Sequence, residues 1–348
     1  MNRALPEVRT THLHSEKISL DVSVMQDLFG VGDTNLNIIE NTLSVSVSTR
    51  GGYIEVSGEE GNVRLTLDTL RTLEKMHKSG EALNDFAVSR AIDLVREGQG
   101  DALASAMQDT IAIAHNGTPV KCRTIGQRKY VDAMRKNTVT ICIGPAGTGK
   151  TYLAVAAVVG MLKRKEIERI VMCRPAVEAG EKLGFLPGDL QNKVDPYLRP
   201  LYDALDELLG HDTVQRYIEN RTIEIAPLAY MRGRTLKNAG CLIDECQNMT
   251  LMSHKLILTR LGEGSRMILT GDVTQIDLPA GTESGLARCA ELLSDIEGIG
   301  VVRLGSRDVI RHKLVGQIVK AFDKYEGQKK EKKPVKGDKY RFRKMTGR

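Results

Sequence analysis

The sequence lacks the features of a membrane or secreted protein. Its longest apolar run, 153–162, is far shorter than the about 20 residues that cross a bilayer. Residues 1–21 alternate polar and charged positions without an apolar core, so a signal peptide is not expected. The six cysteines form no CxxC pair and mostly lie inside apolar runs, which predicts reduced, packed thiols rather than a disulfide or zinc framework. We therefore expect a cytoplasmic protein without membrane contact.

The sequence also lacks a net positive charge outside one segment. The chain carries 50 Lys+Arg against 44 Asp+Glu, a net charge of +6. Residues 327–348 alone hold ten Lys/Arg and two acids, so the remaining residues sum to −2. The basic segment is either a salt-sensitive, sequence-independent contact to RNA phosphates or a solvating extension.

Length and composition are those of a globular protein with two domains. Of the 348 residues, 41% are hydrophobic and 27% charged, and no internal repeat is visible. The patterns predict a flexible arm at 1–17, an α+β domain at 18–79, a helical connector and linker at 80–123, an α/β core at 124–325, and a basic disordered tail at 326–348.

The two domains differ in their hydrophobic periodicity. The first is expected to contain a helix at 35–43 capped by Asp33 or Thr34, a hairpin turning at Gly51-Gly52, and a helix at 63–78. Helical stretches are expected at 84–97 and about 101–113, with the linker proper at 116–123. In the second domain, helices alternate with short apolar runs, which predicts a parallel sheet with strands at 139–143, 170–173, 223–225, 241–243, 266–270 and 301–304.

A phosphate-binding loop lies between the first of these strands and an apolar helix. The motif GxxxxGK[ST] is formed by Gly144, Pro145, Ala146, Gly147, Thr148, Gly149, Lys150 and Thr151. Glycines let backbone N–H groups surround a phosphate, and the helix directs its positive end toward it. We expect Lys150 to neutralise the β- and γ-phosphate oxygens of ATP and the Thr151 hydroxyl to ligate Mg²⁺.

Two later strands are expected to complete the site. The run 241–243 ends in Asp244, which would reach the metal, and Glu245, which would orient or deprotonate the attacking water. The strand 266–270 is followed by GDVTQ, whose Gln275 would hydrogen-bond the γ-phosphate. Upstream, Gln127 would read the edge of adenine, although an exposed helical glutamine is an equally good interpretation.

Together these motifs resemble the first ATPase core of superfamily 1 helicases, and more closely the PhoH family of ATPases. Four stretches carry the second resemblance: GPAGTGKTYLA at 144–154, CRPAVEAGEKLGFLPGDLQNKVDPYLRPLYD at 173–203, LAYMRGRTLKNAGCLIDECQNMT at 228–250 and TGDVTQIDLP at 270–279. The resemblance implies an α/β P-loop NTPase of RecA-like type with a small N-terminal KH-like domain. It also implies ATP hydrolysis, a role in RNA metabolism beside an rRNA-maturation endoribonuclease, and a homo-oligomer such as a hexameric ring.

The chain departs from these patterns at two points. A KH domain clamps nucleic-acid phosphates with GxxG, but here Gly30-Val31-Gly32 is followed by Asp33, whose carboxylate would repel them. The N-terminal domain is therefore either an RNA-binding module or a purely structural one. A second helicase core, which would supply an arginine to the transferred phosphoryl group, is missing. We expect Arg307 or Arg311 of a neighbouring subunit to supply it; surface salt bridges are the alternative for both.

Other arginines lie where helicase cores touch nucleic acid. Arg174 follows the strand 170–173, and Arg232 and Arg234 lie in the turn after Met231. They are candidate RNA contacts or, equally, solvated loop charges.

Three functions remain open from the sequence. The first is a Mg²⁺-dependent ATPase that remodels or unwinds RNA. The second is a nucleotide-controlled scaffold or regulator of a partner endoribonuclease. A small-molecule kinase fits less well, because the sequence shows no acceptor pocket or lid and the GDxxQ element would have no role.

Overall fold

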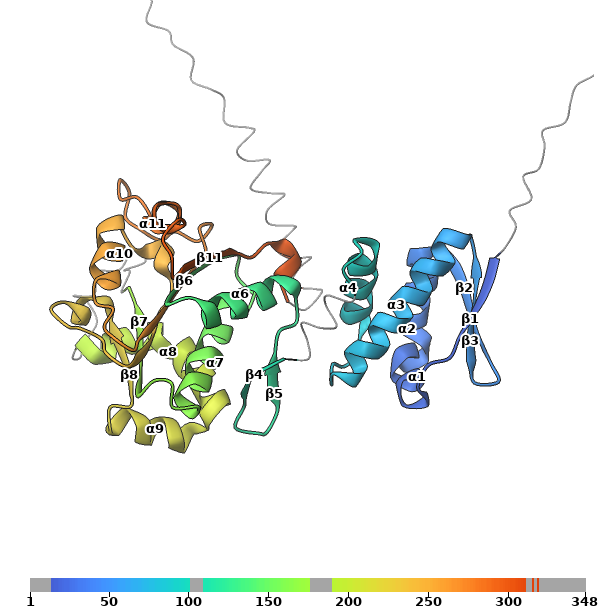
Figure 1. Cartoon of the computed structure of the whole chain (residues 1–348), viewed down its shortest axis with the longest axis horizontal. Helices are drawn as coiled ribbons and strands as arrows, with labels where there is room; N and C mark the ends of the chain where they lie inside the picture. Colours follow the sequence, from blue (N-terminus) through green and yellow to red (C-terminus); the bar gives the residue numbers. More distant parts are fainter. Residues whose placement is uncertain (1–13, 101–108, 176–189, 311–314, 316–317, 319–348) are drawn as a thin grey trace, which may run out of the picture. The chain divides into compact units, whose positions relative to one another are not determined.

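The computed structural model describes residues 14–100, 109–175 and 190–310 together with positions 315 and 318, and the side chains of 190–197 are not among them. Within these residues, no helix is long and apolar enough to cross a membrane. The chain forms an N-terminal α+β part and an α/β core (Figure 1). The predicted basic tail lies outside the described residues, as do the first thirteen positions.

The N-terminal part is an α+β unit with an antiparallel sheet of order β1-β3-β2. Its elements are β1 (His14–Ile18), α1 (Val22–Phe29), α2 (Thr34–Leu43), β2 (Val45–Arg50), β3 (Tyr53–Gly58), α3 (Glu60–Lys78) and α4 (Asp85–Arg96). The hairpin between β2 and β3 turns at Gly51 and Gly52, which both have positive φ. Val45 and Val47 are buried while Ser46 and Ser48 are exposed, so one face of β2 packs against the core.

Two boundaries of this unit differ from the sequence-based expectation. Strand β1 begins at His14, inside the segment expected to be a loose arm, because it pairs with β3 along its whole length. Helix α4 matches the helix expected at 84–97, but Val88 and Ile92 on it are buried in the same hydrophobic core as α2 and α3. It therefore packs as part of the unit rather than as a free connector.

The α/β core begins with a hairpin rather than a linker. Strands β4 (Thr110–Ile113) and β5 (Pro119–Lys121) pair across the segment expected to be helix and then linker. The helix expected at 101–113 is thus wrong for 110–113, and 101–108 lie outside the described residues. The hairpin is ordered by burial, since Ile111 and Val120 belong to the core of the α/β part.

A six-stranded parallel sheet organises the core, as predicted. Its strands are β6 (Val139–Ile143), β7 (Arg169–Arg174), β8 (Ile223–Pro227), β9 (Ala239–Ile243), β10 (Arg266–Gly271) and β11 (Ile299–Arg303), in the order β11-β6-β10-β9-β7-β8. The order places β10 between β6, which leads into the phosphate loop, and β9, which leads into Asp244. Because all six strands are parallel, the loops after their carboxyl ends meet at one edge.

Helices cover both faces of this sheet (Figure 1). One face packs against α6 (Ile125–Lys136), α7 (Lys150–Lys163), α8 (Leu190–Leu209) and α9 (His211–Glu219), and the other against α10 (Leu251–Leu258) and α11 (Leu286–Leu293). Successive strand residues alternate between the two cores: Ile170 and Met172 face the first, Val171 and Cys173 the second. Both faces are buried, which explains why these strands read as continuous apolar runs in the sequence.

All six cysteines are free and buried, as the sequence predicted. Burial raises the pKa of Cys122 and Cys241 to about 12 and that of Cys289 to about 11, and it raises the pKa of the other three further. The desolvated thiolate is disfavoured, so the thiols stay protonated and unreactive at neutral pH.

We therefore expect Ellman's reagent, used near pH 8 where an exposed thiol of ordinary pKa reacts readily, to modify few of these thiols in the native protein. After unfolding in guanidinium chloride, the same reagent should titrate all six cysteines. Rapid native labelling of Cys246 or Cys142, identified by mass spectrometry, would contradict the packing described here.

Candidate nucleotide site

The phosphate loop connects β6 to α7 in the geometry that the motif predicts. It starts where the Gly144 N–H donates to the Gly271 carbonyl at 3.0 Å, so the loop is fixed to the neighbouring strand. Gly147 and Gly149 have φ of 83° and 75°, values that favour glycine. A Cβ on Gly149 would also lie only 3.0 Å from Nε2 of Gln127. Helix α7 begins at Lys150 and directs its positive N-terminus into the loop.

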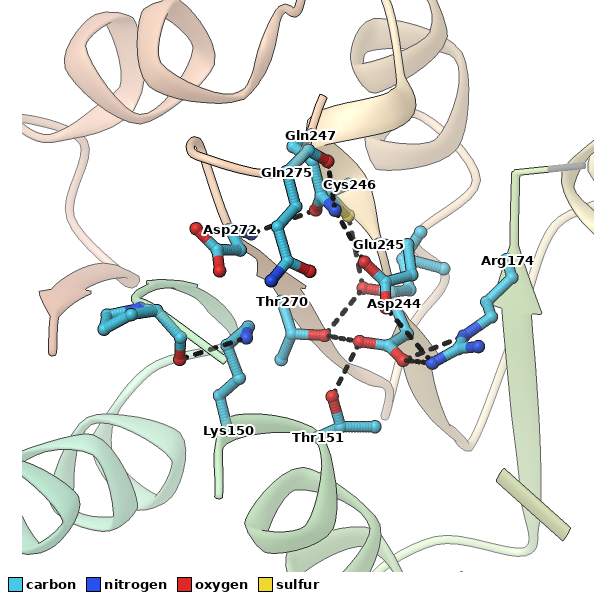
Figure 2. A network of polar contacts seen from close by, with 12 residues as sticks. Lys150, Thr151, Arg174, Asp244, Glu245, Cys246, Gln247, Thr270, Asp272 and Gln275 are labelled. Carbon is cyan, nitrogen blue, oxygen red and sulfur yellow. Dashed lines mark hydrogen bonds and ion pairs between the residues drawn. The ribbon is translucent and has the colours of Figure 1, made fainter. Parts of the chain in front are cut away.

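The side chains of the loop are held by its own backbone. The Thr148 hydroxyl donates to the Pro145 carbonyl at 2.9 Å, and Nζ of Lys150 lies 3.5 Å from the same oxygen. Lys150 is thus folded back over the loop and half-buried (Figure 2). A cation in this position is suited to bind the β- and γ-phosphates of a nucleotide.

Asp244 is the centre of the polar network at the sheet edge. It follows β9 and is 1% exposed, so its charge needs partners. Oδ1 accepts from the hydroxyls of Thr151 at 2.9 Å and Thr270 at 2.5 Å. Thr151 comes from the start of α7 and Thr270 from β10, so the carboxylate joins the phosphate loop to two adjacent strands (Figure 2).

Arg174 closes the other side of Asp244. It ends β7, the other neighbour of β9, and its Nε and Nη2 donate to Oδ2 of Asp244 at 2.9 and 2.6 Å. Nη2 also lies 3.3 Å from Oε1 of Glu245. The arginine side chain is 13% exposed, so the guanidinium is turned into the site rather than toward solvent. Its predicted contact with nucleic acid remains a prediction, and in this structure it pairs with both carboxylates.

Magnesium fits the donor set formed by Thr151 and Asp244. In phosphate-binding sites Mg²⁺ takes one or two oxygen ligands from the protein and completes its shell with phosphate and water. A hydroxyl and a carboxylate at 2.9 Å from each other supply such ligands. Among the described residues there is no cluster of three or more His, Cys, Asp or Glu side chains that would form an all-protein metal cage.

Glu245 has an unusual backbone conformation. Its φ of 55° and ψ of 38° are left-handed, a conformation that costs energy for a residue with a Cβ. The turn re-aims the chain, so that Glu245 projects beside Asp244 into the open edge while Cys246 turns into the core. Oε2 of Glu245 accepts from Nε2 of Gln247 at 2.6 Å.

Asp272 and Gln275 lie on the loop after β10. Asp272 is 2% exposed, and its Oδ2 accepts the Ala146 N–H of the phosphate loop at 2.9 Å. Its Oδ1 accepts from both the N–H and the hydroxyl of Thr274, which tightens the turn. Gln275 is exposed, and Figure 2 shows its amide pointing into the space between Lys150 and Glu245. The sequence-predicted Lys150, Thr151, Asp244, Glu245 and Gln275 thus meet at one edge of the sheet.

Gln127 lies behind the phosphate loop. It is 3% exposed, its Nε2 donates to the Thr148 carbonyl at 2.9 Å, and its Oε1 accepts the Arg123 N–H at 2.7 Å. Both polar atoms therefore have backbone partners here, and the predicted reading of adenine stays a prediction. The interpretation as an exposed helical glutamine is wrong, because the side chain is buried against the loop. Tyr130, one turn later on α6, donates to the Lys150 carbonyl at 3.3 Å.

The remaining candidate arginines do not enter this network. Arg234 makes a two-pronged pair with Glu224, at 2.5 and 2.7 Å, which lowers the pKa of that carboxyl. Arg232 is exposed in the adjacent turn. The side chain of Arg307 is 77% exposed in a short 3-10 segment, and Arg311 lies outside the described residues.

Sequence reasoning missed the side chains that connect the motifs. Thr270, Asp272 and Gln247 lie inside the quoted motifs, yet no role was assigned to them. The available signal was their position: each is polar and sits at or just after the end of a strand in an apolar context. The contacts among these side chains depend on β9 and β10 being adjacent in the sheet, and the strand order could not be predicted from the sequence.

The strand, glycine loop and helix, with a buried carboxylate two strands away at the same edge, define an α/β protein with a P-loop nucleotide-binding core. A family model described as "PhoH-like protein" matches residues 119–323. The chain belongs to the PhoH family.

Relatives of this family match most of the chain. It is 48% identical over 297 residues to the "PhoH-like protein" of Bacillus subtilis, which covers 85% of this chain and 93% of that protein. The "PhoH-like protein" of Synechocystis is 44% identical over 299 residues, covering 86% and 91%, respectively. "Protein PhoH" of Escherichia coli is 35% identical over 271 residues, covering 77% and 74%. Among solved structures, the Sulfolobus solfataricus SWI2/SNF2 ATPase core in complex with dsDNA matches at a TM-score of 0.31 and 17% identity over 51% of this chain and 43% of that one, too distant to bear on function.

Replacing Gln127 tests the support behind the loop. The Gln127→Leu variant leaves the Thr148 carbonyl and the Arg123 N–H without their side-chain partner, and a buried group left unsatisfied costs about 1–3 kcal/mol. We expect the free energy of unfolding in urea to fall by that order. Gln215→Leu on the exposed face of α9 is the matched control and should unfold like the wild type. Equal midpoints for Gln127→Leu and the control would show that the buried amide does not support the loop.

Proposed function

We propose that this PhoH-family protein binds ATP with Mg²⁺, hydrolyses it, and couples the cycle to RNA in the cytoplasm. The observation that carries the hydrolysis is the convergence of Lys150, Thr151 and Glu245 at one open edge around the buried Asp244. Phosphoryl transfer to water requires positioning and charge stabilisation more than covalent chemistry, and these side chains supply both.

Each residue has a separable task in this proposal. The glycine-loop N–H groups and Lys150 hold the phosphates, and Thr151 with Asp244 holds Mg²⁺, which when bound neutralises charge on the phosphate oxygens. Glu245 accepts a proton from, or orients, the attacking water. Gln275 contacts the γ-phosphate and returns to solvent after its loss. Arg307 and Arg311 are proposed to act in trans in a homo-oligomer, a hexameric ring being one such assembly.

The Lys150→Ala variant tests the site assignment. Removing the cation is expected to lower ATP turnover at least about 100-fold, the scale for losing one electrostatic contact to the transition state. Turnover is measured by phosphate release, and folding by circular dichroism. Lys237→Ala, which removes an exposed lysine away from the loop, is the matched control and should retain wild-type turnover. A folded Lys150→Ala protein that still hydrolyses ATP would refute the assignment.

A nucleotide-controlled scaffold for a partner endoribonuclease is the second candidate, and one observation favours it. Residues 14–100, the N-terminal unit, carry eight Lys/Arg against fourteen Asp/Glu. Its Gly30–Asp33 turn adds an exposed carboxylate where a KH domain would meet phosphate. A surface of this sign repels nucleic acid, so the unit is better suited to a protein partner, and RNA would have to meet Arg232 or the segment 327–348.

RNA dependence separates the two candidates. For the RNA-coupled ATPase we expect a single-stranded oligoribonucleotide to raise turnover, and its binding to weaken with salt at a slope near −0.7 per phosphate neutralised. Deletion of 327–348 should reduce both the affinity and this slope, because ten Lys/Arg are lost. Turnover that ignores RNA, together with unchanged binding after the deletion, would favour the scaffold.

A further inference from the structure

Gln247 connects the two loops that flank the reacting edge of the site. Its side chain is 1% exposed. Nε2 donates to Oε2 of Glu245 at 2.6 Å and to the Gln275 carbonyl at 3.0 Å, while Oε1 accepts the Asp272 N–H at 3.0 Å. The amide thus donates two hydrogen bonds and accepts one, and Figure 2 shows it between the two loops.

The chemistry of these partners fixes the orientation of the amide. A carboxylate and a carbonyl are both acceptors, so they must face the NH₂ group, and a backbone N–H must face the oxygen. No other side chain of this length offers two donors and one acceptor. Glutamate would place a second carboxylate 2.6 Å from Glu245, and leucine would leave all three partners without a bond.

The hydrogen bonds of Gln247 continue from Glu245, the residue proposed to orient the attacking water, to the phosphate loop. Asp272, whose N–H is bound by Gln247, uses its own carboxylate to accept the Ala146 N–H at 2.9 Å. Asn248, the next residue after Gln247, adds a parallel bond, because its Oδ1 accepts the Asp277 N–H at 2.8 Å. The segments around Glu245, Gln275 and Ala146 are thus joined by one chain of hydrogen bonds that passes through the buried Gln247 and Asp272.

We propose that Gln247 is a positioning residue that sets the carboxylate of Glu245 according to the position of the Gln275 loop. This inference rests on the proposed ATP hydrolysis and deepens it. Glu245 is held in a left-handed backbone conformation and is 37% exposed, so its carboxylate needs a side-chain partner to stay in one orientation. Contact of Gln275 with a γ-phosphate would move the carbonyl that Gln247 binds, and this movement would reach Glu245 through the same NH₂ group.

If Gln247 positions Glu245, replacing it should weaken stabilisation of the transition state and leave binding of the nucleotide ground state unchanged. In Gln247→Leu, kcat should fall about 10- to 100-fold, the scale for misplacing a reacting group by an ångström, whereas the Kd of ADP should change less than about twofold. The affinity for ADP with aluminium fluoride, which mimics the transferred phosphoryl group, should fall by a factor similar to that of kcat. Gln247→Glu, which retains the acceptor for Asp272 but loses both donors, should be equally impaired, because the contact to Glu245 is lost in both.

Gln215→Leu, a glutamine replaced on an exposed helix, is the matched control and should behave as the wild type in every assay. A merely structural role would lower the melting temperature and the active fraction while leaving kcat per bound nucleotide unchanged, and that result would overturn the inference. So would a Gln247→Glu protein with wild-type kcat. If wild-type protein showed no turnover, the proposed function itself would fail, and the ADP and aluminium fluoride affinities would still report on Gln247.

Discussion

The structure of the site depends on one buried charge. Asp244 is almost completely removed from solvent at the end of β9, where an unpartnered carboxylate would cost several kcal/mol. Its partners come from the three segments that must meet for the chemistry: Thr151 from the phosphate loop, Thr270 from β10 and Arg174 from β7. Breaking any one of these contacts leaves the charge incompletely compensated, so the carboxylate fixes the register of the loops as well as offering a ligand to the metal.

The sheet order makes this arrangement possible. Because β10 lies between β6 and β9, the segment Thr270–Asp272 touches both the phosphate loop and the carboxylate loop. Gly271 accepts from Gly144 on one side, and a Cβ at Gly271 would lie 2.9 Å from Oε1 of Gln247 on the other. A side chain at this position would push the two loops apart. Close packing therefore explains why a glycine precedes Asp272. The middle strand is therefore the element that joins the phosphate loop to the loop of Asp244 and Glu245.

The sequence was sufficient to predict the parallel core and the residues that meet at its open edge, Lys150, Thr151, Asp244, Glu245 and Gln275. Strands buried on both faces appear in the sequence as continuous apolar runs. The GxxxxGK[ST] spacing between a strand and a helix is specific to phosphate-binding loops. The sequence was insufficient to predict the side-chain contacts that depend on which strands are adjacent in the sheet. Arg174 was expected to be either a nucleic-acid contact or a solvated loop charge. The second interpretation is wrong, because β7 lies next to β9 and the guanidinium pairs with the buried Asp244. The hairpin β4–β5 and the strand β1 were missed because each is short and is stabilised by pairing and burial rather than by a local pattern.

The proposed function includes ATP turnover, in addition to nucleotide binding, at the edge formed by Asp244 and Glu245. The most direct measurement is phosphate release from ATP by the full-length protein, with Mg²⁺ and with the chelator EDTA, alongside equilibrium binding of a fluorescent ATP analogue. Turnover that requires Mg²⁺ and stops in Glu245→Gln, while that variant still binds the analogue, is the predicted result. Tight binding without phosphate release from the wild type, at any subunit concentration and with RNA present, would contradict the account and leave a nucleotide-controlled scaffold.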